Sequence, residues 1–340
     1  MRIAVVNDMP LAIEALSRVL GQSPEHQLAW VARKGDEAIA QCAQDRPDLI
    51  LMDIYMPTVN GVEATREIMA KTPCPILIVT ASIESHTSKV FEALGAGALD
   101  VVTTPVLGAD GLGDGGPALL AKINVLSKLI TGKAPRPRSA EPEAVPRVSS
   151  AQNRLVAIGA SAGGPAALAA VLGRLPRDFP AAIVMVQHVD GQFAPLMAKW
   201  LNDQSALPVR TASEGDQPAP GVALIAGTDD HLVFKEPREL GYTSHPRAMS
   251  YRPSADVFFE SVVRHWKGDV VGVLLTGMGR DGAKGLKALR ENGALTIAQD
   301  RESCVVYGMP KAAVELGAVM EVLTLDDIAA RLVRHFPAIK

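Results

Sequence analysis

The sequence contains few cysteines and few aromatic residues. Three cysteines, Cys42, Cys74 and Cys304, occur among 340 residues, and aromatic residues make up 4% of the chain. An odd number of distant cysteines without a C-x-x-C spacing argues against a disulfide framework and against a zinc site. The seven histidines include no H-x-x-x-H pair, which also argues against a metal-dependent enzyme. We therefore expect the cysteines to be buried thiols.

The chain also lacks a large excess of one charge and lacks long apolar runs. Its formal net charge is −3 and it has no long basic run, so we expect no nucleic-acid partner. No apolar stretch approaches the roughly 20 residues needed to span a bilayer, so we expect no membrane insertion. The N-terminus becomes acidic at Asp8, which leaves too short a segment for a signal peptide. These features predict a cytoplasmic protein.

Two α/β domains are predicted from the hydrophobic pattern. In both halves, apolar segments of strand length alternate with amphipathic segments of helix length, which predicts parallel sheets covered by helices on both faces. Residues 131–150 contain four prolines among charged residues and serines, a composition typical of a partly extended linker. We predict domains over residues 1–130 and 151–340, joined by this linker.

The predicted strands set the fold of each domain. In the first domain five strands, each followed by a helix, indicate a small doubly wound fold of flavodoxin type. The second domain is predicted to be a doubly wound, mostly parallel α/β fold, with helices that begin at Gly164, Ala194, Ala255, Asp281 and Asp326. The predicted strands are 3–6, 28–32, 49–52, 76–79 and 99–102 in the first domain, and 155–158, 182–186, 222–225, 270–275 and 295–298 in the second.

Polar residues follow three strands of the first domain and predict an acidic pocket. Asn7 and Asp8 follow the first strand, Asp53 the third and Thr80 the fourth. The carboxyl ends of parallel strands lie along one edge of a sheet, so Asp8 and Asp53 are expected to be close together. Two carboxylates with a carbonyl and waters suit Mg²⁺, and a carboxylate beside Mg²⁺ can attack a phosphoryl group.

This half resembles a response-regulator receiver domain over nearly its whole length. The resemblance rests on the segment Leu51-Met52-Asp53-Ile54-Tyr55-Met56-Pro57, followed by Gly61. It implies that Asp53 is phosphorylated by a sensor histidine kinase, that Asp8 and Asp53 bind Mg²⁺, and that Thr80 is the switch residue. The sequence departs from the receiver pattern at Asn7, where an acid is usual, at Val101, where an aromatic residue is usual, and at Thr104, where a lysine is usual.

The second half contains the pattern of a nucleophile elbow. An apolar run ends at Gly159, passes through Ser161 and Gly163, and enters an alanine-rich segment. Small neighbours allow a serine to stand on a tight turn between strand and helix. His188 ends the second predicted strand and Asp281 follows the fourth, so one sheet edge can assemble all three residues.

These residue types predict nucleophilic catalysis. Ser161 would be the nucleophile, His188 the general base and then acid, and Asp281 the carboxylate that orients the imidazole. The loop Gly277-Met278-Gly279 can direct backbone amides at the same point, so Met278 is a candidate oxyanion contact, together with the amide of Ala162. The mechanism needs no cofactor. The chain order Ser, His, Asp differs from that of α/β-hydrolases.

The second half resembles the catalytic domain of chemotaxis-type protein-glutamate methylesterases from Leu155 to Phe336. The resemblance implies a triad of Ser161, His188 and Asp281. It also implies hydrolysis of γ-glutamyl methyl esters on the cytoplasmic helices of methyl-accepting chemoreceptors, often with glutamine deamidation. The motifs that carry it are Gly159-x-Ser161-x-Gly163-Gly164, Gln187-His188, Arg252-Pro253-Ser254-x-Asp256, Leu275-Thr276-Gly277-Met278-Gly279-x-Asp281-Gly282, Ala298-Gln299-Asp300 and Gly308-Met309-Pro310.

Some interpretations remain open at this point. Arg252 either binds an acidic receptor surface or braces the fold. Residues Asn7, Val101 and Thr104 suggest a branch that serves surface sensing of the Wsp type rather than flagellar chemotaxis. The glycines at 277, 279 and 282 also satisfy G-x-G-x-x-G, with Asp300 after the next strand, as in an NAD(P)-binding oxidoreductase. A third alternative is a non-enzymatic binding module controlled by the receiver.

Overall fold

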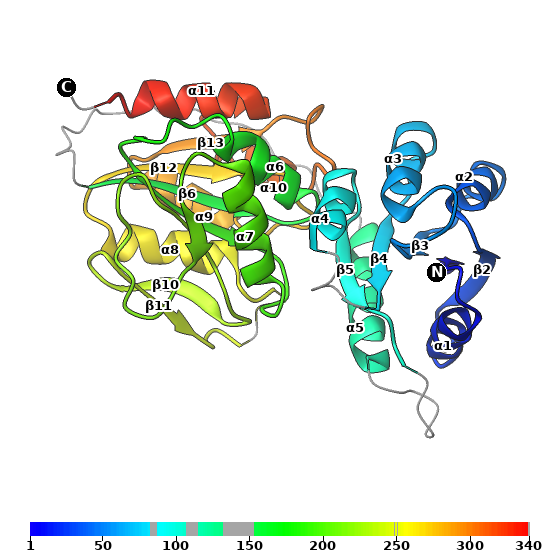
Figure 1. Cartoon of the computed structure of the whole chain (residues 1–340). Coiled ribbons are helices and arrows are strands. Elements are labelled where there is room, and N and C mark those ends of the chain that lie inside the picture. The colour runs from blue at the N-terminus through cyan, green and yellow to red at the C-terminus, as the bar shows by residue number, and fades with distance from the viewer. Residues whose placement is uncertain (82–86, 107–114, 132–152, 248, 250, 339–340) are drawn as a thin grey trace. The chain divides into compact units, whose positions relative to one another are not determined.

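The computed structural model describes residues 1–81, 87–106, 115–131, 153–247, 249 and 251–338. The chain divides into two compact units, Met1–Ala134 and Pro135–Lys340 (Figure 1). The predicted linker, residues 131–150, lies outside the described residues except for Thr131. Each unit is a layered α/β structure, as the hydrophobic pattern predicted.

The first unit contains a five-stranded parallel sheet in the order β2-β1-β3-β4-β5. This is the flavodoxin-type order, and all five predicted strands are present within one or two residues of their expected bounds. The elements are β1 (Arg2–Val6), α1 (Pro10–Gly21), β2 (Gln27–Ala32), α2 (Gly35–Gln44), β3 (Leu49–Met52), α3 (Gly61–Lys71), β4 (Ile76–Thr80), α4 (Thr87–Gly95), β5 (Asp100–Thr103) and α5 (Gly116–Thr131).

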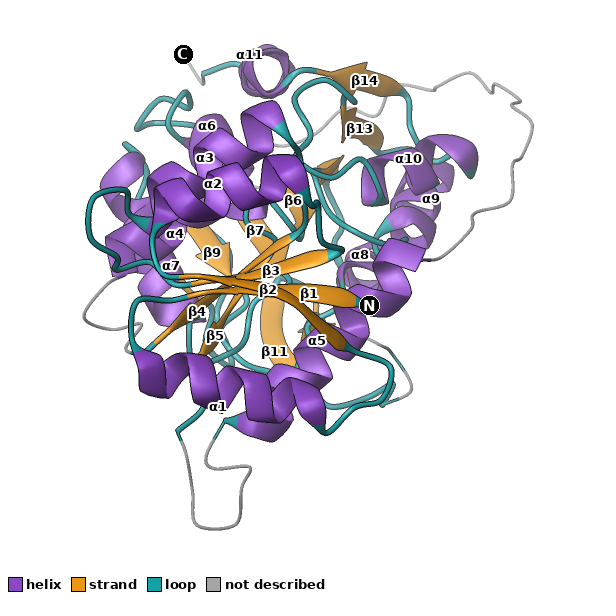
Figure 2. Ribbon diagram, turned by 90° about the vertical axis from the view of Figure 1, so that its right-hand side faces the viewer, coloured by secondary structure: helices purple, strands orange, loops and turns teal. Residues whose placement is uncertain are grey.

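Helices cover both faces of this sheet. Every residue of the central strands β3 and β4 is buried, as expected for parallel strands enclosed on both sides. Helices α1 and α5 pack on one face, and α2, α3 and α4 on the other (Figure 2). The two thiols of this unit, Cys42 and Cys74, are buried as predicted, and burial raises the pKa of Cys74 to about 12.

The second unit contains a seven-stranded sheet whose paired strands are all parallel, in the order β14-β13-β12-β6-β7-β9-β8. A separate antiparallel hairpin is formed by β10 and β11. The elements are β6 (Arg154–Ala160), α6 (Gly164–Leu172), β7 (Ala182–Gln187), α7 (Ala194–Gln204), β8 (Val209–Thr211), β9 (Ala223–Ile225), β10 (His231–Glu236), β11 (Glu239–Thr243), α8 (Ala255–His265), β12 (Asp269–Leu274), α9 (Ala283–Glu291), β13 (Leu295–Gln299), α10 (Met309–Glu315), β14 (Glu321–Leu323) and α11 (Leu325–His335).

The sequence pattern identified the five inner strands of this sheet but neither edge strand. β8 and β14 have three residues each and are only partly buried, so they produce no apolar run. The hairpin and α10 were also not predicted. The helix expected from Asp281 begins at Ala283, because Asp281 and Gly282 form the turn that precedes it. Cys304 is half-buried rather than buried.

The hairpin packs on the helical layer formed by α8, α9 and α10, while α6, α7 and α11 lie together. Aromatic rings join the hairpin to α8: Phe234 of β10 stacks with Phe258 at 6.3 Å and contacts Trp266 at 5.4 Å between ring centroids. These rings anchor α8, whose N-terminus lies at the site described below. Among the described helices of the whole chain, none is long and apolar enough to cross a membrane.

Candidate active site and receiver pocket

The three residues predicted to form a triad follow three neighbouring strands. In the seven-stranded sheet, β12, β6 and β7 lie side by side. Ala160 of β6 pairs with Gln187 of β7, so the next residues, Ser161 and His188, occupy matching positions past the strand ends. Asp281 lies in the loop that follows β12. The carboxyl ends of parallel strands thus gather these residues at one edge of the sheet.

The turn that carries Ser161 requires two glycines. β6 ends at Ala160 and α6 begins at Gly164, so three residues reverse the chain from strand to helix. Gly163 has a φ of +75°, a left-handed conformation that residues with a side chain rarely adopt. A β-carbon on Gly164 would lie 1.9 Å from the side-chain oxygen of Gln187. The strand, turn and helix of a nucleophile elbow are therefore present.

Buried polar groups hold the backbone of this turn. The Ser161 amide donates to the Thr276 carbonyl at 3.0 Å. The side-chain amide of Gln187 donates to the carbonyls of Ser161 at 2.9 Å and His188 at 3.1 Å. Gln187 is 3% exposed, so these bonds are protected from water. A single side chain thus fixes the backbone of the proposed nucleophile relative to that of the proposed base.

His188 and Asp281 are in direct contact. His188 Nε2 lies 2.7 Å from Asp281 Oδ2, and both side chains are almost fully buried. Asp281 accepts three further hydrogen bonds at the N-terminus of α8, from the Ser254 hydroxyl at 2.7 Å and from the amides of Ala255 at 2.6 Å and Asp256 at 3.2 Å. Burial alone would raise the pKa of Asp281, but the bonds from His188, Ser254 and Ala255 outweigh it and the pKa is lowered.

The contact with Asp281 defines the role of each imidazole nitrogen. A carboxylate only accepts hydrogen bonds, so Nε2 of His188 carries a proton and Nδ1 of the neutral ring is an acceptor. Nδ1 is buried and has no partner among the described residues. The hydrogen bonds found for Ser161 in the described part of the chain all involve its backbone. The structure therefore brings His188 and Asp281 into direct contact and places Ser161 beside them without a side-chain bond.

Tyr251 covers the imidazole ring and was given no role by the sequence analysis. Its ring stacks on that of His188 with centroids 4.4 Å apart and planes 7° apart. Burial raises the pKa of Tyr251 to about 12, so its hydroxyl is neutral at physiological pH. The stacked ring limits the orientations open to His188. Its neighbour Arg252, for which two roles were considered, is exposed.

A buried histidine is connected to Asp281 through Ser254, and the sequence analysis did not identify it. His231, on β10, accepts the Ser254 amide through Nδ1 at 3.1 Å. Its Nε2 lies 3.3 Å from the carbonyl of Pro246, which can only accept, so Nε2 carries the proton. Burial lowers the pKa of His231, so the ring is neutral. Ser254 also caps α8 by accepting the Val257 amide. A continuous set of hydrogen bonds therefore runs from His231 through Ser254 to Asp281 and His188.

Two backbone amides remain candidates for an oxyanion contact. In the described residues, no acceptor is found for the amides of Ala162 and Met278. The carbonyl of Ser161 shares its peptide group with the Ala162 amide and accepts from the Gln187 side chain at 2.9 Å, which holds that peptide in place. A β-carbon on Gly277 would lie 2.8 Å from Cβ of Ser161, so the loop that carries Met278 packs against the serine.

The same glycines were the basis of the dinucleotide alternative. In the structure this loop packs on Ser161, and Asp281 within it binds His188. The Asp300 carboxylate accepts hydrogen bonds from the hydroxyl and the amide of Ser303 and from the amide of Glu302. The glycine-rich loop is thus part of the serine site, and the acid expected to bind a ribose is engaged in a local turn.

In the receiver, Asp53 lies at the end of β3 in a buried setting. It is 9% exposed, and Oδ1 accepts the Ile54 amide at 2.7 Å. Burial raises the pKa of Asp53 to about 6, and the nearby charge of Asp8 adds to the rise, while the amides of Ile54 and Tyr55 oppose it. Asp8 is exposed. Thr80, the predicted switch residue, is buried and its carbonyl accepts the Thr104 amide at 3.0 Å.

The donor set of this pocket fits Mg²⁺. The charge of Asp8 acts on Asp53, and both residues offer hard carboxylate oxygens, the ligands that Mg²⁺ prefers. Asn7 is buried and its side-chain oxygen accepts the Met9 amide at 2.8 Å, so this residue shapes the loop. Within the described ranges, no group of three or more His, Cys, Asp or Glu side chains is placed to hold a metal ion. Water would have to complete the coordination.

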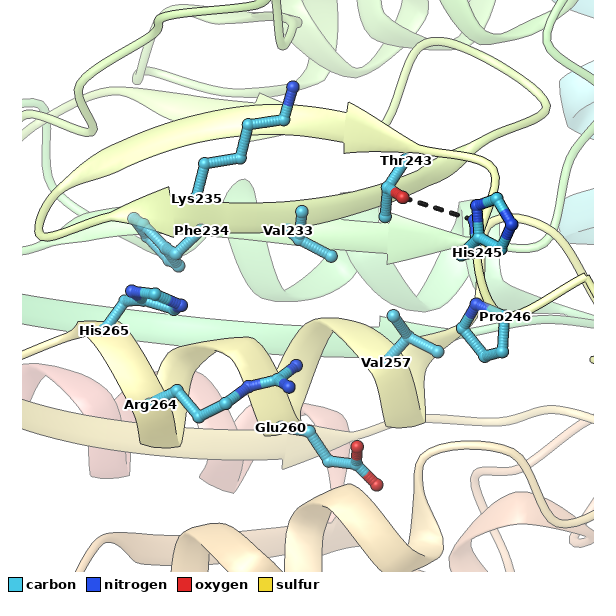
Figure 3. Close-up of a pocket in the computed structure, with 10 residues that line it drawn as sticks. All are labelled: Val233, Phe234, Lys235, Thr243, His245, Pro246, Val257, Glu260, Arg264 and His265. Carbon is cyan, nitrogen blue, oxygen red and sulfur yellow. Dashed lines mark hydrogen bonds between the residues drawn. The ribbon is translucent and has the colours of Figure 1, made fainter.

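A pocket of about 680 Å³ lies between the hairpin and α8 (Figure 3). Its lining includes the apolar side chains of Val233, Phe234 and Val257 as well as polar and charged side chains. The His245 amide donates a hydrogen bond to the Thr243 hydroxyl at 3.2 Å. None of the residues that line this pocket belongs to the predicted triad. The contacts among His188, Asp281 and the Ser161 turn therefore define the candidate site, and the pocket does not.

Comparison with known proteins decides the family. A model of the CheB methylesterase family matches residues 156–332, and a model of the response regulator receiver domain matches residues 3–111. The chain belongs to the CheB methylesterase family. Membership confirms the resemblance drawn from the sequence, together with the fold of both units and the assignment as a methylesterase with a receiver. It does not support the oxidoreductase or the non-enzymatic alternative.

Relatives of this family match the chain from end to end. The protein-glutamate methylesterase/protein-glutamine glutaminase 3 of Pseudomonas aeruginosa is 55% identical, over 99% of this chain and 100% of its own length. A protein-glutamate methylesterase/protein-glutamine glutaminase of Mesorhizobium japonicum is 54% identical over 98% of both chains. The crystal structure of the Thermotoga maritima CheB methylesterase catalytic domain is 36% identical with a TM-score of 0.51, covering 53% of this chain and 97% of that one.

Proposed function

We propose that this methylesterase hydrolyses γ-methyl esters of glutamate on methyl-accepting chemoreceptors, with Ser161, His188 and Asp281 as its triad. The observation that carries the proposal is the 2.7 Å contact between His188 and Asp281 beside the glycine turn that presents Ser161. A serine hydroxyl is a poor nucleophile until a neighbouring imidazole takes its proton, and the buried carboxylate stabilises the resulting cation.

The first half of the reaction forms an acyl-enzyme. Ser161 Oγ attacks the ester carbonyl while its proton passes to Nδ1 of His188, the nitrogen left without a partner. The oxyanion that results accepts hydrogen bonds from the amides of Ala162 and Met278, each of the kind worth about 3 kcal/mol. The intermediate then collapses, the bond to the methoxy oxygen breaks, and the proton on His188 leaves with methanol.

The second half regenerates the enzyme. Water attacks the acyl-enzyme and gives one proton to His188, which passes it to Ser161 Oγ as the bond between this oxygen and the acyl carbon breaks. The glutamic acid that leaves loses its remaining acidic proton to solvent. The same steps act on a glutamine side chain, with ammonia as the first product in place of methanol. We therefore propose glutaminase activity as well, in keeping with the names of both relatives. Every step uses groups of this chain and water.

The receiver regulates the esterase through phosphorylation, and we propose Asp53 as the phosphoacceptor of a sensor histidine kinase. Mg²⁺ held by Asp8 and Asp53 would neutralise charge as the phosphoryl group is transferred. The buried setting of Asp53 supports this role. We also propose that the two domains comprise residues 1–130 and 151–340, joined by a linker. Because the receptor helices concerned are cytoplasmic in the family that the chain resembles, we propose that the protein acts in the cytoplasm.

The test measures methanol release from receptor membranes carrying radiolabelled methyl esters. Ser161→Ala should lower release by at least about a thousandfold, since a triad loses most of its activity with its nucleophile. Ser213→Ala, at an exposed serine of the same unit, is the matched control and should retain activity. Asp53→Ala should remove only the response to a phosphodonor. Substantial release by Ser161→Ala would refute the assignment of the nucleophile.

A further inference from the structure

The receiver has a threonine rather than a lysine after β5, at position 104, and a cation from α4 lies over an aromatic ring two residues beyond Asp53. The ammonium group of Lys89 is 4.9 Å from the ring centroid of Tyr55. Tyr55 is two residues beyond Asp53, and its amide donates to the Asp53 carboxylate. The positive charge of Lys89 therefore lies against a side chain of the loop that follows Asp53, whereas position 104 holds a threonine.

We propose that Lys89 binds the phosphoryl group on Asp53 and supplies the charge that Thr104 cannot. This inference rests on the proposed phosphorylation of Asp53. Lys89 is half-buried, and no ion pair or hydrogen bond to its ammonium group is found within the described residues. An ammonium group whose contact in the described residues is a ring face is available for a stronger partner. A charge-assisted hydrogen bond to phosphate oxygen is stronger than a contact with a partly exposed aromatic ring.

Other cations of the receiver are less suited to this role. Lys122 of α5 is engaged by the Asp100 carboxylate and the Val101 carbonyl, both at 2.9 Å. Asp100 begins β5, so this pair lies at the strand end opposite Thr104. Lys34 follows β2, and in the sheet order β1 lies between β2 and β3. Lys34 is exposed and lies at the same sheet edge as Asp53, which makes it a matched control.

The experiment uses the full-length protein and titrates beryllofluoride in the presence of Mg²⁺, followed by ¹⁹F NMR. Lys89→Met should weaken beryllofluoride binding at least tenfold, while Lys89→Arg and the control Lys34→Met should stay within about threefold of the wild type. Mg²⁺ binding measured alone should not weaken in Lys89→Met, because the substitution removes a repelling cation. Adding Thr104→Lys to Lys89→Met should restore beryllofluoride affinity. A purely structural role for Lys89 would reduce binding of both probes together and would not be rescued.

A second measurement needs no substitution. In the wild type, the ¹⁵N signal of the Lys89 ammonium group should shift on addition of beryllofluoride and Mg²⁺ but not with Mg²⁺ alone. Equal beryllofluoride affinity in the wild type and Lys89→Met, or an unchanged Lys89 signal, would overturn the proposal. Failure of the proposed phosphorylation looks different: the wild type itself would then bind no beryllofluoride and gain no Asp53-dependent mass from acetyl phosphate. Both proposals would fall in that case.

Discussion

Asp53 in the receiver and Asp281 in the esterase are both buried carboxylates that follow a strand of a parallel sheet, yet their pKa values move in opposite directions. The pKa of Asp53 rises to about 6, whereas that of Asp281 falls. Burial pushes both values upward. The difference lies in the donors: two backbone amides face Asp53, while Asp281 accepts four hydrogen bonds, one of them from an imidazole.

This contrast indicates how the same position, just past a strand of a parallel sheet, suits the two kinds of chemistry that we propose. When a carboxylate accepts few hydrogen bonds and has an acid beside it, its buried negative charge is poorly stabilised. A bound cation then stabilises the charge, and one carboxylate oxygen remains available to attack phosphorus. A carboxylate at a helix N-terminus with every lone pair engaged remains charged and is suited to hold an imidazolium. The number of hydrogen bonds that each carboxylate accepts, rather than its depth of burial, distinguishes the two aspartates and fits the different roles that we propose for them.

Replacement of Asp281, whose charge is stabilised by four hydrogen bonds, should have the largest effect on activity. In Asp281→Asn, the side-chain amide can donate to His188 and favour the wrong tautomer of the imidazole. We expect methanol release to fall by about 10³- to 10⁴-fold with the fold retained. Steady-state assays on methylated receptor membranes would measure this loss, and ¹⁵N NMR of His188 would report the tautomer. Activity within tenfold of the wild type would exclude Asp281 from the triad.

Replacement of Asp53, whose buried charge is stabilised by few hydrogen bonds, should stabilise the receiver. A carboxyl whose pKa is raised from 3.8 to about 6 favours folding below pH 4 and loses that contribution as the pH rises through 6. Asp53→Asn removes the cost of the buried charge, so at pH 7.5 and without divalent metal we expect the receiver to gain up to about 3 kcal/mol.

Calorimetry of the full-length protein at pH 7.5 and pH 5 would test this expectation. The difference in receiver unfolding free energy between Asp53→Asn and the wild type should decrease as the pH falls through 6, because the wild-type carboxyl then becomes neutral. A gap that stays constant across this range would show that charge burial at Asp53 is not its cause.

Loss of one donor to Asp281 should have a smaller effect of the opposite sign. Ser254→Ala removes the hydroxyl bond to Asp281 and the cap on α8, so we expect a loss of about 1 to 2 kcal/mol in unfolding free energy at pH 7. The pKa of Asp281 should move upward in this variant. Since a lowered pKa stabilises the fold only while the carboxylate is ionised, the loss should diminish as the pH falls below 4. Denaturant unfolding of the wild type and Ser254→Ala at pH 7 and pH 3.5 would measure the loss in unfolding free energy at each pH.

The sequence predicted the main features of this site because they depend on chain order and strand ends. Ser161, His188 and Asp281 each follow an apolar run, and parallel strands bring such positions to one edge. The glycines of the turn were also recognised from the sequence, and the structure shows that a side chain at Gly164 would collide with Gln187. The inner strands were recognised from buried runs, whereas β8 and β14 are too short and too exposed to produce one.

Residues that act through contacts between distant elements were not found in this way. Tyr251 lies in a loop without periodicity, and only the folded chain places its ring on His188. His231 begins an unpredicted hairpin, so nothing in its local sequence connects it with Ser254. Lys89, which we propose as the phosphoryl-binding cation, was missed for the same reason: the expected position, Thr104, follows β5, and Lys89 comes from the preceding helix.

The anchoring of Asp281 also limits how the esterase can be regulated. A carboxylate tied to the first turn of α8 by Ser254, Ala255 and Asp256 has no alternative rotamer that keeps the same bonds. Moving it would break the hydrogen bonds that it accepts at the start of a helix packed against Phe234 of the hairpin. We therefore expect an inactive form of the enzyme to keep the 2.7 Å contact between His188 and Asp281.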